Sequence, residues 1–229
     1  MDKRKKYFLL IDVETAGPLG ASLVYDLGLA ITDKQGNIYE SRSFLIKEIW
    51  DQKNLMQTAY YARKIPKYEK DLKLGKFEIV QWSQAVTTIN DLIEKWNVST
   101  IAAYNLYFDK TAIAHTHKTL GHSGKAISKK FAGKIDQICL WGLACETIFK
   151  QKSFQKMAKK HNWVSKKGNK RTTAEVAFRY LTNKPNFEES HTGLEDVKIE
   201  TQIMARCFRQ KKKISGGIIS HPWRIPQRI

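Results

Sequence analysis

Two carboxylates directly follow a short apolar run near the start of the sequence. Residues 7–11 are apolar, and Asp12 and Glu14 come next, separated by a single valine. In a β-strand, residues two apart point to the same face, so both acids would project together from the end of a buried strand. Two like charges there are costly unless a cation holds them, and hard divalent cations prefer oxygen ligands. The pair is therefore a candidate metal site, and a solvated loop is the alternative interpretation.

A third carboxylate follows another short apolar run. Residues 98–104 form that run, Asn105 interrupts it, and Asp109 stands at the expected start of a helix. The partial positive charge at a helix N-terminus stabilises a carboxylate in this position. Asp109 is therefore either an ordinary helix-start acid or a further acidic contribution to the site formed by Asp12 and Glu14.

A histidine and a further acid lie at the start of the last expected helix. His191 and Asp196 are five residues apart, a spacing that does not stack two side chains on one helix face. If His191 lies in the approach to the helix and Asp196 lies within it, both side chains can reach one cleft. The neighbouring Glu189 and Glu195 are expected to face solvent.

Taken in chain order, these groups resemble the motifs of a known enzyme family. The segments are Asp12-Val13-Glu14-Thr15, then Asn105 to Asp109 with Phe108, and finally His191-Thr192-Gly193-Leu194-Glu195-Asp196. The ordered set is similar to the DEDDh, or DnaQ-like, group of 3′→5′ exonucleases, which includes DNA-polymerase proofreading subunits, ribonuclease T and oligoribonuclease. The resemblance spans residues 7–200. It implies an α/β domain of the ribonuclease H-like fold, with a mixed five-stranded sheet flanked by helices.

The resemblance implies a metal-dependent hydrolase that removes 5′-mononucleotides from the 3′ end of DNA and/or RNA. Asp12, Glu14 and Asp196 would bind one Mg²⁺ or Mn²⁺ ion. Asp12 would also bridge to a second ion, which Asp109 would help to hold. Two such ions stabilise the attacking and leaving oxygens of a phosphoryl displacement. Four carboxylates leave a two-ion site close to neutral before the phosphate arrives.

Two further roles follow from the resemblance. His191 would act as general base on the attacking water, and an unperturbed histidine pKa of about 6.5 suits that role at neutral pH. Thr15 would contact the terminal nucleotide of the substrate. The sequence leaves open a catalytically inactive nucleic-acid-binding or polymerase-associated module of the same fold, and a nuclease with a different polarity or target.

The chain carries a large excess of positive charge. It has 229 residues, with 40 Lys and Arg against 22 Asp and Glu, for a formal net charge of +18. Lys and Arg neutralise phosphates and release counterions, so this balance favours a DNA or RNA partner. Basic residues concentrate in residues 64–76, 163–171 and 210–229, although each cluster alone is more typical of a solvated face. A DNA polymerase or another replication or repair protein is a further candidate partner.

The sequence also bears on the compartment. The three cysteines, Cys139, Cys145 and Cys207, have no metal-binding or redox spacing and are expected to pack as small apolar residues in a reducing compartment. The basic N-terminus precedes an apolar run that is too short for a signal peptide, and no segment has the length of a membrane helix. We expect a cytoplasmic protein with no membrane partner.

The remaining pattern predicts strands first and helices later. Expected strands cover residues 7–14, 22–33, 38–47 and 98–104, and short turns between the first three predict an antiparallel meander. Expected helices cover residues 51–63, 82–96, 108–120, 136–149, 153–161 and 193–210, with another opening at Thr172 or Thr173. This order predicts one α/β domain, residues 1–209, which the resemblance implies is an exonuclease domain, and a poorly ordered basic tail, residues 210–229.

Overall fold

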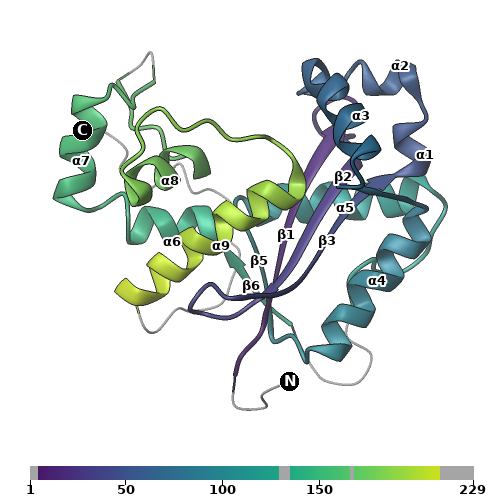
Figure 1. The fold of residues 1–229 in the computed structure, drawn as a ribbon. Coiled ribbons are helices and arrows are strands. Elements are labelled where there is room, and N and C mark those ends of the chain that lie inside the picture. The colour runs from purple at the N-terminus through teal and green to yellow at the C-terminus, as the bar shows by residue number, and fades with distance from the viewer. Residues whose placement is uncertain (1–4, 129–134, 166–167, 212–229) are drawn as a thin grey trace.

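The protein is built on one six-stranded mixed β-sheet with helices packed around it (Figure 1). The computed structural model describes residues 5–128, 135–165 and 168–211. The strand order is β4-β3-β2-β1-β5-β6, so β1, the strand that carries Asp12 and Glu14, lies in the interior of the sheet. Nearly all of the predicted basic tail, residues 212–229, lies outside the described residues.

The first three strands form the predicted antiparallel meander. β1 (Phe8–Ala16), β2 (Leu23–Thr32) and β3 (Ile38–Ile46) pair in sequence order. Their β-branched and large apolar residues fit a pleated, buried surface. β1 also pairs in parallel with β5 (Thr100–Ala103). The C-terminal ends of β1 and β5 therefore meet at the same edge of the sheet, beside the first turn of the helix that follows β5.

The sheet has six strands rather than the predicted five. β4 (Glu78–Val80) pairs in parallel with β3, and β6 (Asp136–Cys139) pairs in parallel with β5. β4 is too short to show a period. β6 occupies the start of the predicted helix at residues 136–149, because four residues, two polar and two apolar, are too few to show a period. The helix that follows, α6 (Leu140–Glu146), is correspondingly shorter.

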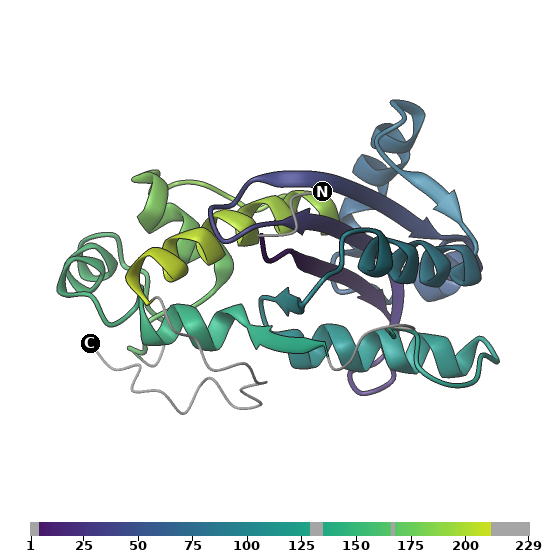
Figure 2. The same ribbon diagram turned by 90° about the horizontal axis from the view of Figure 1, so that it is seen from below.

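The longer helices lie close to where the sequence predicts them. They are α4 (Trp82–Lys95), α5 (Leu106–Thr119), α7 (Lys152–Lys160), α8 (Ala174–Thr182) and α9 (Gly193–Gln210). Figure 2 shows α9 with α6, α7 and α8 at one side of the molecule and α4 with α5 at the opposite side. α8 begins at the predicted Thr173 cap, whose hydroxyl accepts a hydrogen bond from a backbone N–H of the first turn.

The connection from β3 to β4 consists of short helical pieces and replaces the predicted helix at residues 51–63. These are α1 (Lys47–Trp50), α2 (Lys53–Met56), the 3₁₀ turn η1 (Ala62–Lys64) and α3 (Ile65–Lys73). Pro66 fits the first turn of α3 because a backbone N–H there would have no helical partner. The Gly17 N–H, just after β1, donates to the Thr58 hydroxyl at 2.9 Å, so this connection lies beside the end of β1.

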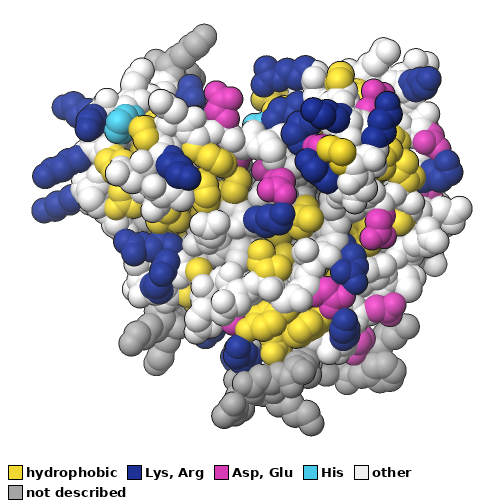
Figure 3. All heavy atoms as spheres, viewed as in Figure 1, with side chains coloured by type: hydrophobic (Ala, Val, Ile, Leu, Met, Phe, Trp, Pro, Cys, Tyr) yellow, Lys and Arg dark blue, Asp and Glu magenta, His cyan; other side chains and the backbone are white. Residues whose placement is uncertain are grey.

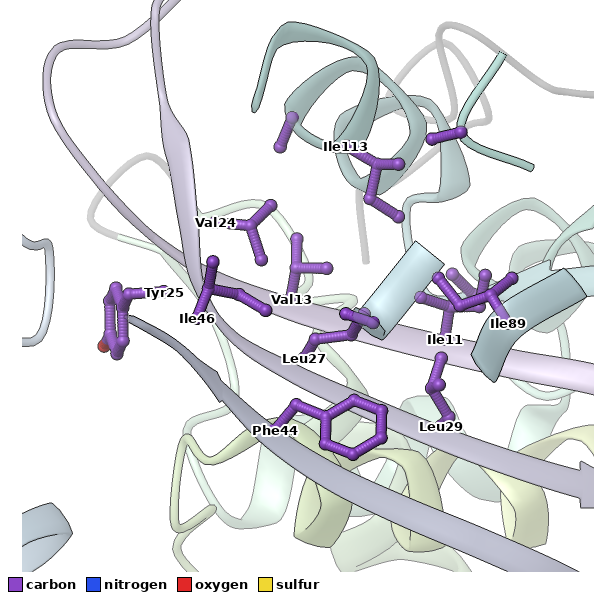
Figure 4. Close-up of a cluster of buried hydrophobic side chains, with 14 of the residues drawn as sticks. Ile11, Val13, Val24, Tyr25, Leu27, Leu29, Phe44, Ile46, Ile89 and Ile113 are labelled. Carbon is purple, nitrogen blue, oxygen red and sulfur yellow. The ribbon is translucent and has the colours of Figure 1, made fainter. Parts of the chain in front are cut away.

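The alternation of side chains along β1 divides them between two apolar cores. Ile11 and Val13 belong to the core that includes residues of α4 and α5, part of which is drawn in Figure 4. Leu10 belongs to the second core, with residues of α6, α8 and α9. Asp12 and Glu14 share the parity of Leu10, so the strand directs their carboxylates toward α9, as predicted.

The three cysteines are free thiols, and all of them are buried, as predicted from their spacing. Burial raises the pKa of Cys145 to about 12 and that of Cys207 to about 11, so both stay protonated at neutral pH. Within the described part of the chain, no helix is long and apolar enough to cross a lipid bilayer.

Candidate active site

Four of the predicted residues line one cleft at the C-terminal end of β1. The cleft has a volume of about 480 Å³, and its walls include Asp12, Glu14, His191 and Asp196. Glu14, His191 and Asp196 each offer an oxygen or nitrogen atom, and these atoms lie within 4.8 Å of one another. Residues from opposite ends of the domain therefore form a group compact enough to surround one cation.

Asp109 lies against β1, next to this group. It is 3% exposed, and its carboxylate accepts hydrogen bonds from the backbone N–H groups of Val13 and of Asp109 itself. Asn105 turns the chain from β5 into α5 in the left-handed conformation, at φ 75°, which asparagine tolerates better than most residues. Asp109 then falls in the first turn of α5, as predicted, and the parallel pairing of β5 with β1 brings that turn to the cleft.

His191 is held in a defined orientation. Its imidazole stacks on the Tyr61 ring, with centroids 4.1 Å apart and planes 12° apart, and its backbone adopts the left-handed conformation at φ 50°. Burial, together with the positive charges of Lys64 and Arg63, lowers the pKa of His191 to about 4. The ring is therefore neutral at pH 7 and keeps a lone pair that can accept a proton.

A buried hydrogen-bonded brace fixes the loop between His191 and α9. The Tyr68 hydroxyl donates to Asp26 Oδ2 at 2.6 Å and lies 3.1 Å from the carbonyl oxygen of His191. The Gly193 N–H donates to the same Asp26 oxygen at 2.8 Å. A Cβ on Gly28 would lie 2.1 Å from the carbonyl carbon of Gly193, so only glycine lets α9 begin directly on the backbone of β2. The brace thereby fixes the position of the His191 backbone relative to β2.

Lys64 supplies positive charge next to the carboxylates. Its ammonium donates to the carbonyl oxygen of Ser190 at 2.5 Å, which attaches η1 to the loop before α9. Its charge lowers the pKa of Glu14 and of Asp196, opposing the effect of their burial. Lys64 therefore stabilises both the loop geometry and the ionised acids.

The acids at this site are buried close together, and both conditions raise their pKa values. Burial raises the pKa of Asp109 and of Asp196 to about 8, and it raises the pKa values of Asp12 and Glu14 well above the usual range. Among the described residues, Asp12 Oδ2 and Asp196 Oδ1 are buried without a hydrogen-bond partner. Buried carboxylate oxygens without donors match the ligand chemistry of a hard divalent cation, so the residues present fit Mg²⁺ or Mn²⁺.

The prediction that Glu189 faces solvent is wrong, whereas Glu195 is exposed as expected. Glu189 lines the cleft, and its Oε2 lies 3.9 Å from His191 Nδ1. Burial raises the pKa of Glu189 to about 7, and the nearby charge of Glu175 adds to that shift. Glu189 lies in a loop, where neither the helical nor the strand period indicates which way a side chain points.

Thr15 is half-buried and is not among the residues that line the cleft, and the register of β1 against β2 shifts between Glu14 and Thr15. Other residues line the cleft although no motif indicated them: Tyr61, Tyr104, Trp141, Thr172, Glu175 and Glu200. Some signals for the missed residues exist in the sequence. Asp26 and Gly28 interrupt an apolar strand, and Glu200 follows Asp196 by one helical turn on the same face.

The fold is similar to that of solved exonuclease structures. They include E. coli exonuclease I in a zinc-bound complex with single-stranded DNA (TM-score 0.57, 16% identity), the E. coli enzyme with a dT13 oligonucleotide (0.59, 17%) and a product-bound exonuclease I (0.59, 17%). Each match covers 91% of this chain but only 42–44% of the other. No protein-family model matches the sequence, and no curated protein matches it significantly.

These matches confirm the predicted fold class, a ribonuclease H-like mixed sheet flanked by helices. At 16–17% identity they establish the architecture alone. The chain spans less than half the length of the exonuclease I structures, so it corresponds to one part of those proteins.

Proposed function

We propose that the chain is a metal-dependent 3′→5′ exonuclease that removes 5′-mononucleotides from the 3′ ends of nucleic acids. The observation that carries the proposal is the convergence of the predicted acids and the histidine at one end of β1. Hydrolysis of a phosphodiester needs oxygen ligands for hard cations and a neutral base for water, and this group supplies both. The similarity of the fold to that of exonuclease I also supports the proposal of an exonuclease.

The acids would form the cation centre. Asp12, Glu14 and Asp196 would hold one Mg²⁺ or Mn²⁺ ion, and Asp12 and Asp109 would hold a second. When bound, such ions stabilise the negative charge on the attacking and leaving oxygens of the phosphoryl transfer. The carboxylates come from the central strand and from two helices packed on the sheet, so their positions are fixed before substrate arrives.

His191 would take the proton from the attacking water. The ring is neutral at pH 7 because its pKa is lowered to about 4, and its stacking on Tyr61 keeps the ring plane fixed. A neutral imidazole in a fixed orientation accepts a proton without first having to lose one. The contact of Thr15 with the terminal nucleotide stays a prediction from the resemblance.

The distribution of positive charge supports a nucleic-acid substrate. Figure 3 shows Lys and Arg side chains gathered over α7 on one side and around α3 on the other, with a hollow between them. The exposed lysines of α7 are Lys152, Lys156, Lys159 and Lys160. Cationic side chains on both sides of a cleft attract and orient a phosphate backbone. Two of the similar exonuclease I structures hold single-stranded DNA or a dT13 oligonucleotide, which supports the same class of substrate here.

The proposal is tested with matched DNA and RNA oligonucleotides labelled at the 5′ end, both single-stranded and with a 3′ overhang. Wild type, Asp12→Ala, His191→Ala and the surface control Glu195→Gln are incubated with Mg²⁺, Mn²⁺ or EDTA. We expect a metal-dependent ladder that shortens from the 3′ end with wild type and Glu195→Gln only. Internal cuts would identify an endonuclease. Salt-sensitive binding without cleavage would identify a catalytically inactive binding module, and co-purification with a polymerase would place that module in a replication complex.

A further inference from the structure

Glu200 is a buried acid of the cleft that none of the predicted roles uses. It lies one helical turn after Asp196 on α9, is 2% exposed, and lines the same cleft as Asp12 and Asp196. The backbone N–H of Tyr104 donates to its carboxylate. Its other oxygen, Oε2, is buried without a hydrogen-bond partner among the described residues.

The surroundings of Glu200 make this burial costly. A carboxylate removed from water destabilises the fold unless a cation or several donors hold it, and like charges four residues apart on a helix repel. The charges that act on Glu200 most strongly are those of other acids, first Asp109 and then Asp196 and Glu189. Glu200 is in turn the acid whose charge most raises the pKa of Asp12, after the effect of burial.

A second buried acid, Asp26, shows what a purely structural carboxylate looks like in this protein. Asp26 Oδ2 receives both the Tyr68 hydroxyl and the Gly193 N–H, whereas Asp26 Oδ1 is buried without a partner among the described residues, as Glu200 Oε2 is; Asp26, however, does not line the cleft. Its pKa is raised only to about 6, because these two donors oppose the effect of burial. Glu200 differs from Asp26 in having a single donor and in lining the cleft beside Asp12 and Asp196, where a cation could reach its carboxylate.

We propose that Glu200 is a fifth carboxylate of the cation centre and a ligand of one of its divalent ions. This inference rests on the proposed metal dependence of the site. Five carboxylates carry one negative charge more than two divalent cations neutralise. Lys64, whose ammonium charge acts on Glu14 and Asp196, supplies the balancing positive charge.

The test is a calorimetric titration of MnCl₂ into the metal-free full-length protein, with no nucleic acid present. The variant Glu200→Gln keeps the size and the acceptor for the Tyr104 N–H but removes the charge. We expect it to weaken binding of one ion by about tenfold or more, the range seen when groups supporting a metal centre are removed. The matched control is Glu195→Gln on the same helix, whose side chain is 55% exposed and paired with Lys198. It should bind both ions as wild type does.

Thermal melting in EDTA provides a second readout. Glu200→Gln should melt at the same temperature as wild type or higher, because it replaces a buried carboxyl surrounded by other acids with a neutral amide, and Mn²⁺ should raise its melting temperature less than that of wild type. If Glu200→Gln does not fold, Glu200→Asp takes its place: it keeps the charge, withdraws the carboxylate by one methylene and should lose cation affinity as well.

The outcomes separate this inference from the proposed function. If wild type binds two ions and Glu200→Gln binds them equally well, the role of Glu200 is overturned, but the proposed metal dependence is not. Wild type that binds no divalent cation would overturn both the metal dependence and the inference. A chain that binds cations in the expected pattern but cleaves no nucleic acid would overturn the nuclease and leave the assignment of Glu200 standing.

Discussion

The two faces of β1 place neighbouring residues in opposite environments. On one face, Ile11 and Val13 are at most 5% exposed and pack in an apolar core. On the other, Asp12 and Glu14 face the acids of α9, and Asp12 has a buried oxygen without a donor. Burying the apolar surface of the first face lowers the free energy of the folded state. Bringing like charges together out of water on the second face raises it.

The contrast indicates that the apolar face stabilises the charged one. Buried like charges persist only where the surrounding structure fixes them more firmly than they can disrupt it. Here the central position of β1 and its two apolar cores provide that structure. A bound divalent cation would turn the contribution of the charged face to folding stability from unfavourable to favourable. Stability and function should therefore respond differently to changes on the two sides of the strand.

The largest expected effect comes from Asp12→Ala, which removes a charge from the charged face. Activity should fall by more than about 100-fold, because changes to groups that merely support a metal centre already cost about 10- to 100-fold. The melting temperature in EDTA should stay the same or rise, since carboxylate repulsion is relieved. Oligonucleotide cleavage and thermal melting measure the two effects, and an Asp12→Ala protein that is unfolded in EDTA would contradict the comparison.

His191→Ala should lower kcat by about 10²- to 10⁴-fold while changing KM far less, because the proton moves only in the transition state. Single-turnover and steady-state kinetics on one labelled oligonucleotide separate the two parameters. His122→Ala, which removes an exposed imidazole, is the matched control and should behave as wild type. Equal losses in kcat and in apparent affinity would argue against the general-base role.

Ile11→Ala tests the apolar face of the same strand. We expect the free energy of unfolding to fall by about 2–5 kcal/mol, the usual cost of truncating a fully buried aliphatic side chain to alanine. At a temperature where the variant is folded, kcat in Mg²⁺ should stay within a few-fold of wild type. Urea denaturation and cleavage assays measure the pair, and a loss of kcat as large as that of Asp12→Ala would show that the two faces do not act separately.

The smallest expected effect is a pH dependence of stability in EDTA. Asp196 has a pKa of about 8 in the folded protein and about 3.9 when unfolded, so the folded state holds a proton that the unfolded state has lost. Its contribution therefore becomes less favourable as the pH rises from 4 to 8. Asp196→Asn should raise the melting temperature in EDTA near pH 8, and this gain should shrink as the pH falls toward 4. A gain that does not vary with pH would contradict the raised pKa.

Local patterns predicted the elements that repeat a period over many residues. The meander, α4 and α9 follow from alternating or helical apolar spacing, and the Thr173 cap follows from its side-chain chemistry. The pattern failed for β4, which has three residues, and for β6, which has four and directly precedes α6. The helix predicted at residues 51–63 divides into short pieces because that segment has only a moderate apolar stripe.

The sequence indicated which residues would gather at the candidate site but not their environment. The motif order predicted Asp12, Glu14, Asp109, His191 and Asp196, whose catalytic roles stay predictions, and the period of a strand predicted that the first two share a face. The burial of Glu189 depends on the fold of a loop, and the brace of Asp26 and Tyr68 depends on α3 folding back over β2. The lowered pKa of His191 likewise depends on its burial and on the charges of Lys64 and Arg63, which lie far away in sequence.

The sequence by itself determined which residues carry acidic and basic chemistry, and that Asp12 and Glu14 project together from a buried strand. Only the tertiary structure decided that Asp196 and Glu200 meet them, that Glu200 has an oxygen without a donor, and that His191 is neutral. The physical reason is that side-chain periodicity is set within a few residues, whereas desolvation and charge–charge interaction depend on every element packed around a group.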